Sequence, residues 1–122
     1  MKVFFPVNEK SGLEGYISQH FGSARYFFIA DVDEESKEVK NTGYIDNVPH
    51  EMGGCMAPVR LLHDNTADIL VVGGIGMRPL MGFMQVGIEV KHDGDHTKIG
   101  DIINQLDQMP TIERSTCQGS AH

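Results

Sequence analysis

The spacing of apolar residues changes once along this 122-residue chain, and that change limits the folds open to it more than any other feature. In the first third, aromatic and β-branched residues gather in short runs between polar turns, a pattern typical of β-strands. The expected strands cover residues 2–7, 24–32 and 38–45. Because only the polar turn DEESK separates the last two, they are expected to pair as an antiparallel hairpin.

From Cys55 onward the apolar residues recur every three or four positions, which is the spacing of one helical face. Helices are expected to begin near Cys55, Met77 and Ile99. Residues 68–74, DILVVGG, form a continuous apolar run of the kind buried on both faces of a parallel sheet, and residues 87–90 form the last expected strand. The order βββαβαβα predicts a single α/β domain with a mixed five-stranded sheet and helices packed against it.

Composition limits the classes of partner. The chain has 17 acidic and 10 basic residues and a formal net charge of -7, which disfavours nucleic acid because its phosphates are also negative. No apolar run approaches the roughly 20 residues that span a bilayer, and the first residues lack the apolar region of a signal peptide. We therefore expect a cytoplasmic protein without a membrane segment. Its domain is expected to cover residues 1–110, followed by a polar, flexible tail at residues 111–122.

Three glycines and an arginine follow the continuous apolar strand. Gly73, Gly74 and Gly76 lead into the next expected helix, and Arg78 lies in its first turn. Bare backbone N–H groups at the positive end of a helix suit an anion, and the guanidinium group adds a forked donor. Alternatively, the glycines only permit a tight turn and close packing. Residues 73–78 are called the glycine corner below.

A histidine and a cysteine flank the short linker EMGG. From this spacing, the imidazole of His50 and the thiolate of Cys55 can converge on one soft or borderline metal ion. The start of a helix would favour the thiolate form of Cys55. Two other interpretations stay open: Cys55 is a small core residue, or it is a nucleophile. For a nucleophile, His50 is the only partner near in sequence and a third group is missing, so we do not expect an enzyme.

Further histidines lie where loops are expected to meet. His92 and His96 belong to the segment HDGDH, directly after the last expected strand, at the end of the sheet where ligands of α/β proteins collect. Asp95 or Thr97 is expected to cap the following helix. His20 lies between the first two strands and is expected to face the same end, although a solvated loop histidine is the commoner case.

Four segments together resemble the dinitrogenase iron-molybdenum cofactor biosynthesis family: QHFGSARYFFIADVD, HEMGGC, ADILVVGGIGMRPL and GIEV. The resemblance extends from Lys2 to about Met109. It implies a small ribonuclease-H-like α/β domain without nuclease chemistry. It also implies a role among carriers that hold iron-sulfur or molybdenum-containing cluster precursors.

The resemblance also suggests site residues. His20 lies in the histidine-bearing loop of the family, the glycine corner matches its glycine-rich loop, and HEMGGC matches part of the family. We therefore expect a non-enzymatic protein that binds, stores or delivers a metal-sulfur cluster or an iron or molybdenum cofactor precursor. Its expected metal ligands are His20, His50, Cys55 and His92, and its expected partners are cluster donor and acceptor proteins. The alternative is a regulatory module that binds a small-molecule or nucleotide-type anion and no metal.

Overall fold

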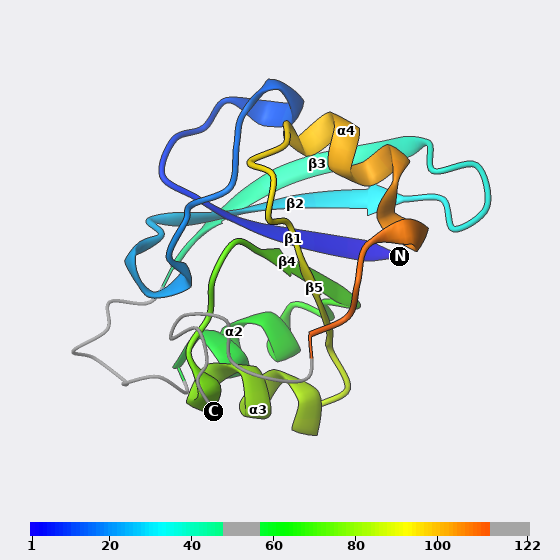
Figure 1. Cartoon of the computed structure of the whole chain (residues 1–122). Helices are drawn as coiled ribbons and strands as arrows, with labels where there is room; N and C mark the ends of the chain where they lie inside the picture. The colour runs from blue at the N-terminus through cyan, green and yellow to red at the C-terminus, as the bar shows by residue number, and fades with distance from the viewer. Residues whose placement is uncertain (48–56, 113–122) are drawn as a thin grey trace.

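The computed structural model describes residues 1–47 and 57–112. One sheet is formed by β1 (Lys2–Val7), β2 (Tyr26–Val32), β3 (Val39–Asp46), β4 (Ile69–Val72) and β5 (Glu89–His92). The strand order is β3-β2-β1-β4-β5 (Figure 1). β2 is antiparallel to both β1 and β3, whereas β1, β4 and β5 are parallel to one another. The predicted α/β domain with a mixed five-stranded sheet is thereby confirmed.

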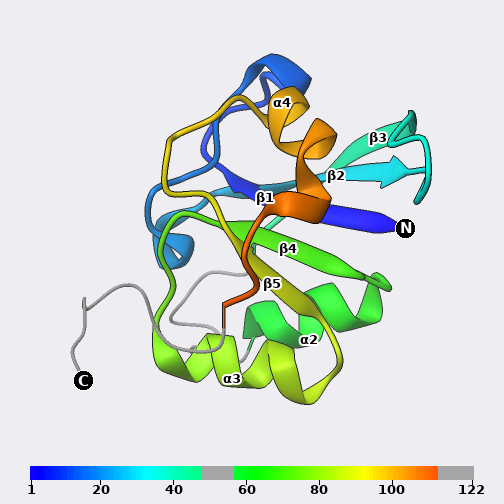
Figure 2. The same ribbon diagram turned by 45° about the vertical axis from the view of Figure 1, so that its right-hand side comes forward.

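Helices cover both faces of the sheet. The helices α2 (Ala57–Asp64) and α3 (Met77–Gln85) lie on one face, while α4 (Ile99–Asn104) lies on the other (Figures 1 and 2). Two 3₁₀ turns, η1 (Gly12–Glu14) and η4 (Leu106–Gln108), lie near α4, and a third, η2 (Phe21–Ser23), precedes β2. The molecule therefore has three layers and two apolar cores, one on each side of the sheet.

The sequence of the central strand explains the two cores. Side chains alternate across a strand, so Val3, Phe5 and Val7 of β1 pack toward α4, whereas Phe4 packs toward α2 and α3. β4 divides in the same way and all four of its residues are buried. A strand that is buried on both faces needs apolar residues at every position, which is why DILVVGG has no polar alternation.

Several boundaries differ from those expected. β4 ends at Val72, so Gly73 and Gly74 belong to the loop that follows. Ile99, Ile102, Ile103 and Leu106 have the spacing of one helical face, but α4 ends at Asn104, because Gln105 leaves the helical conformation with φ -117°. Leu106 then starts η4 and still reaches the core. The predicted helix start at Cys55 lies outside the described residues, and the described helix begins at Ala57.

The chain after η4 lies along β5. The backbone N–H of His92 donates to the carbonyl of Pro110, and that of Ile112 donates to the carbonyl of Val90. Ile112 is buried, so contacts with the sheet extend two residues past the predicted boundary at residue 110. None of the helices in residues 1–47 and 57–112 is long and apolar enough to cross a membrane.

Candidate functional site

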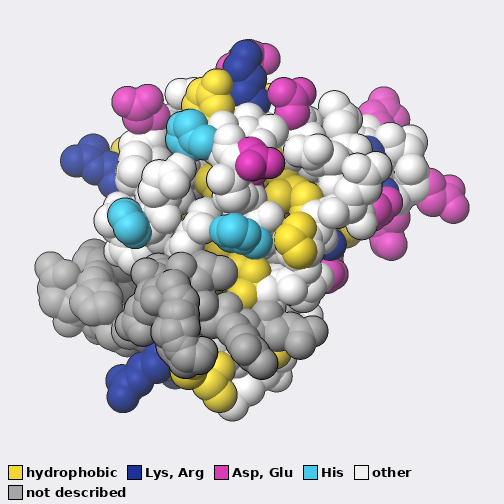
Figure 3. Space-filling model, viewed as in Figure 1, with side chains coloured by type: hydrophobic (Ala, Val, Ile, Leu, Met, Phe, Trp, Pro, Cys, Tyr) yellow, Lys and Arg dark blue, Asp and Glu magenta, His cyan; other side chains and the backbone are white. Residues whose placement is uncertain are grey.

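The parallel strands bring three loops to one edge of the sheet. β1, β4 and β5 end at the same side, and the chain continues there into residues 8–25, residues 73–76 and residues 93–98 (Figure 1). Figure 3 shows histidine side chains spread over this side of the molecule, with apolar side chains between them. We call it the carboxyl edge, and it is where ligands of open α/β sheets bind.

Within the glycine corner, Gly73 and Gly74 are covered by the loop between β1 and β2. A Cβ atom added at Gly73 would lie 3.4 Å from the carbonyl oxygen of Gln19. The carbonyl of Gly74 accepts a hydrogen bond from the N–H of Phe21, at 3.1 Å. The space over Gly73 is thus taken by backbone and Gly74 is bonded to the same loop, which supports the packing interpretation for this half of the corner.

Gly76, by contrast, has no steric need to be glycine. Its φ is -75°, and a Cβ atom there would come no closer than 3.8 Å to a Pro79 ring carbon. Gly76 is the N-cap of α3 and provides no side-chain cap. Because Pro79 has no N–H, the free donors of the first turn are the N–H groups of Met77 and the exposed Arg78. Anion binding is therefore possible at the helix end of the corner.

His92 joins the end of β5 to the glycine corner. Its Nε2 lies 3.0 Å from the carbonyl oxygen of Gly73. A carbonyl can only accept, so Nε2 carries the proton and Nδ1 of the neutral ring keeps a lone pair. The absence of a side chain at Gly94 makes room for the ring, since a Cβ atom there would lie 3.2 Å from His92 Cε1. A metal-binding histidine commonly donates its other N–H in this way.

His20 is exposed at the start of η2 on a well-anchored backbone. Its carbonyl accepts hydrogen bonds from the hydroxyls of Ser18 and Ser23, at 3.0 and 3.1 Å. The next residue, Phe21, is buried between Phe27 and Phe83, with ring centroids at 5.7 and 5.5 Å. The buried Phe21 and the two serine hydroxyls thus hold the backbone of this loop, while the exposed imidazole of His20 points away from the core.

The loop after β5 is held by a buried carboxylate. Asp93, only 6% exposed, accepts the backbone N–H groups of Asp95 and Thr97, at 3.3 and 3.0 Å. The expectation that Asp95 or Thr97 caps α4 is wrong: the N-cap is Lys98, and it makes no side-chain cap bond. The two N–H groups bind Asp93 instead, which turns the chain back before the helix begins.

The same loop presents His96, which has a φ of +55°. Its ring stacks on Tyr16, with centroids 4.5 Å apart and planes inclined by 12°. Its Nδ1 lies 2.7 Å from the amide nitrogen of Gln19. Sequence reasoning missed Tyr16, Gln19 and Asp93 as site residues, because nothing in the spacing indicates that residues so distant in sequence meet here.

Of the expected metal ligands, His20 and His92 reach the carboxyl edge, whereas His50 and Cys55 lie outside the described residues. Within residues 1–47 and 57–112, no group of three or more His, Cys, Asp or Glu side chains is placed to hold a metal ion. The expected ligand set stays a prediction.

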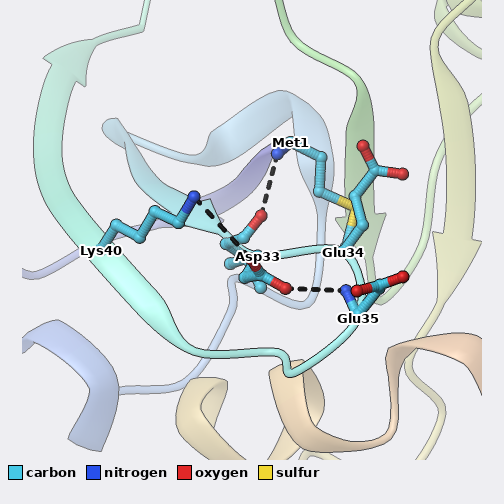
Figure 4. Close-up of a pocket in the computed structure, with 6 residues that line it drawn as sticks. Met1, Asp33, Glu34, Glu35 and Lys40 are labelled. Carbon is cyan, nitrogen blue, oxygen red and sulfur yellow. Dashed lines mark hydrogen bonds and ion pairs between the residues drawn. The ribbon is translucent and has the colours of Figure 1, made fainter.

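Two surface hollows of about 370 Å³ each lie on the described surface. One is lined by residues between 8 and 18, among them Tyr16 and Ser18, and so belongs to the carboxyl edge. The other lies at the opposite end of the sheet, between Met1, Asp33 and Lys40 (Figure 4). The backbone N–H groups of Ser36 and Glu35 hold the pKa of Asp33 below its usual value. The Asp33 carboxylate therefore already accepts hydrogen bonds from the backbone of its own turn.

Comparison with known proteins adds a family and a set of similar folds. The sequence pattern of the family described as dinitrogenase iron-molybdenum cofactor matches residues 1–109. The crystal structure of the protein PH0822 is similar, with 28% identity, a TM-score of 0.74, and coverage of 93% of this chain and 97% of that chain. The apo form of the orange protein from Desulfovibrio gigas has 20% identity and a TM-score of 0.75, covering 94% of this chain and 95% of that one. No curated protein matches.

Proposed function

We propose, because this chain belongs to the dinitrogenase iron-molybdenum cofactor family, that it binds and delivers a metal-sulfur cluster or an iron or molybdenum cofactor precursor without acting as an enzyme. The observation that carries the proposal is the 3.0 Å contact between His92 Nε2 and the carbonyl of Gly73. It leaves the Nδ1 lone pair for a metal ion and fixes the imidazole to the glycine corner. The carboxyl edge thus offers a candidate metal ligand, His92, next to a helix end suited to an anion.

A metal-sulfur cargo requires both kinds of group. Its metal ions take imidazole nitrogen or thiolate sulfur, and its sulfides accept hydrogen bonds. His92 and the exposed His20 offer imidazoles. The N–H groups of Met77 and Arg78, together with the Arg78 guanidinium, offer donors at the positive end of α3. His50 and Cys55, outside the described residues, remain proposed ligands in the same cargo site.

The position of these groups suits a cargo that must leave again. They lie at the carboxyl edge, where β5 ends and α3 begins, and His20 and Arg78 are exposed. A ligand held there stays open to an approaching protein. We therefore propose cluster donor and acceptor proteins as partners and the cytoplasm as the place of exchange.

The alternative function, an anion-binding regulatory module without a metal, is favoured by Gly76. Within residues 1–47 and 57–112, no atom comes close enough to Gly76 to require a glycine, and its small size leaves room for an anion at the N–H groups of α3. A thermal-shift series with nucleotides and phosphate tests this function, because a ligand that binds only the native state raises the melting temperature. An unchanged melting temperature with every compound contradicts it.

The carrier function is tested first by elemental analysis and visible absorption of untagged protein purified without oxygen. We expect iron, molybdenum or copper near stoichiometry and a charge-transfer band. His92→Ala, His50→Ala and Cys55→Ala should each lower the metal content. The matched control is His63→Ala, since His63 is an exposed histidine near the end of α2. A metal-free protein that also fails reconstitution with iron and sulfide contradicts the proposal.

The non-enzymatic part has its own test. A Cys55 nucleophile would require a stabilised thiolate, which alkylates rapidly at neutral pH. We expect slow alkylation, as for an ordinary thiol. Rapid alkylation with a low apparent pKa would instead support a Cys55-dependent activity.

A further inference from the structure

We propose that His96 is a further cargo-binding residue, which donates its Nε2–H group to an anionic oxygen or sulfur atom of the cargo. The proposal rests on the carrier function above and assigns the chemistry that one more residue of the same edge recognises.

The backbone of His96 is held in a conformation that residues with a Cβ atom rarely adopt. Its φ of +55° lies in the left-handed region, where glycine is at ease and other residues are disfavoured. Asp93 enforces this turn, because its buried carboxylate binds the N–H groups on either side of His96. Such conformations persist where surrounding bonds over-determine them, and they cluster at ligand-binding sites.

The ring of His96 is also held, although the residue is exposed. Tyr16 stacks on one face at a centroid distance of 4.5 Å, and the Gln19 amide bonds to Nδ1 at 2.7 Å. Exposed side chains normally keep their rotamer freedom, and fixing one opposes folding. Tyr16 is itself 44% exposed, so the stack adds little to the core. The arrangement is better explained as preorganisation for a ligand.

The bond to Gln19 determines which atom the ring presents. An amide nitrogen can only donate, so Nδ1 of His96 accepts and the neutral ring carries its proton on Nε2. This atom is therefore a donor and suits an anion, unlike His92 Nδ1, which suits a metal ion. The two histidines therefore offer different groups to a cargo, a lone pair at His92 and an N–H donor at His96.

Gln19 links His96 to the glycine corner, since its side chain bonds to His96 and its backbone lies against Gly73. The Cα atom of Gln19 lies 3.5 Å from where a Cβ atom of Gly73 would be, and His20 follows it directly. Among the charged groups nearby, Lys98 is paired with Glu14 at 3.3 Å. Both carboxylate oxygens of Asp93 accept backbone N–H groups, which leaves Asp95 as the exposed acid of the loop. The recognition thus relies on a directed N–H donor and not on net positive charge.

The test is equilibrium dialysis of the full chain against molybdate and, separately, tetrathiomolybdate, with bound molybdenum measured by elemental analysis. His96→Phe keeps a ring to stack on Tyr16 but removes the donor, and should weaken binding about tenfold or more, as expected for one hydrogen bond to a charged group. His96→Gln keeps an N–H donor and should stay within about threefold of the parent. His63→Phe is the matched control and should bind as the parent does.

Each outcome has one meaning. If His96→Phe binds as tightly as the parent, the donor role is overturned. The same holds if His96→Phe and His96→Gln lose binding equally. A parent that binds neither anion but takes up a cluster on reconstitution overturns this inference and leaves the carrier function standing. If the parent binds neither anion and also takes up no cluster on reconstitution, the carrier function is overturned as well. Thermal unfolding shows whether His96→Phe is folded, and a saturable shift of the His96 Nε2 resonance in ¹⁵N-histidine NMR supports the assignment in the parent itself.

Discussion

At the scale of single residues, the glycines around the carboxyl edge serve different purposes. Gly73 is overlaid by the backbone of residues 18–19, Gly94 makes room for the His92 ring, and Gly22 has open space around it. These roles lead to different expectations for the same substitution.

Gly94→Ala should destabilise the fold, whereas Gly22→Ala should not. The new methyl group would lie 3.2 Å from His92 Cε1 and displace the ring from the Gly73 carbonyl. Loss of this hydrogen bond should lower the free energy of unfolding by about 1 kcal/mol, as measured by urea denaturation. Gly22→Ala meets no atom within 4 Å, so equal losses for the two variants would contradict this account.

At this scale the sequence indicated residue types but not their contacts. The glycine corner and His92 were recognisable, because glycines and a histidine after apolar strands are local features. The division of the corner into a packed half and an accessible half was not, since it depends on where Gln19 and Phe21 come to lie. The contacts of His96 with Tyr16 and Gln19 could not be predicted either, because these residues are close only in the folded chain.

At the scale of elements, α3 ends in a defined manner that links it to β5. Gly87 has a φ of +84°, and its N–H donates to the carbonyl of Met84 at 3.1 Å. The N–H of Ile88 reaches back to the carbonyl of Phe83 at 2.9 Å. This is the Schellman arrangement, in which a left-handed residue stops the helix and the next apolar residue returns to the core.

Gly87→Ala should therefore cost about 1 kcal/mol of stability, because alanine is disfavoured at positive φ. Gly43→Ala is the matched control: Gly43 lies in β3, has open space around it and no positive φ. Urea denaturation of the two variants measures the difference. A Gly87→Ala variant as stable as Gly43→Ala would show that the helix end relaxes without the left-handed residue.

A second link between elements depends on pH. The Thr111 hydroxyl, and with it Lys91, holds the pKa of Glu89 below its ordinary value of 4.5. The ionised carboxylate is thus favoured in the folded state. Its contribution to stability is present above pH 4.5 and is lost as the pH falls through the lowered pKa of the folded state.

Replacing Glu89 by Gln should remove this dependence. We expect Glu89→Gln to be less stable than the parent at about pH 7 and to approach it as the pH falls through the lowered pKa of the folded state, where the parent carboxylate becomes protonated as well. Denaturation at neutral pH and at a series of acidic values measures the difference. A gap that stays the same across the series would show that the charge of Glu89 contributes nothing.

At the scale of the whole molecule, two apolar cores on either side of one sheet account for the fold. The core under α2 and α3 also supports the candidate site, since Phe83 of α3 meets the loop residue Phe21 edge to face at 85°. The opposite face of α3 leaves Met77 and Met81 about half exposed. One short helix therefore contains residues of very different importance for stability.

Phe83→Leu should destabilise the protein by about 1–2 kcal/mol, because it removes ring atoms from a fully buried position. Met81→Leu, on the exposed face of the same helix, should change stability by less than about 0.5 kcal/mol. Thermal and urea denaturation measure both. If Phe83→Leu is also near neutral, the core beneath the site must repack without loss.

The architecture followed from the sequence more fully than the site did. The change of apolar period and the uninterrupted run DILVVGG predicted a mixed sheet, because each depends on neighbours along the chain. The end of α4 at Asn104 did not follow, since Leu106 has the helical spacing but reaches the same core from a 3₁₀ turn. Apolar spacing indicates which side chains are buried, and the backbone has more than one way to bury them.

The central position of β1 has a consequence for the order in which the chain folds. During synthesis β1, β2 and β3 leave the ribosome before β4 and can pair with one another, since all three precede β4 in the chain. The other edge of β1 pairs with β4, where Val3 meets Ile69, so its hydrogen-bonding groups have no permanent partner until β4 has been made. Non-local parallel pairing is slow, and an open apolar edge is prone to aggregate. The nascent protein thus passes through a stage in which a strand that is central in the folded sheet lies at an open edge.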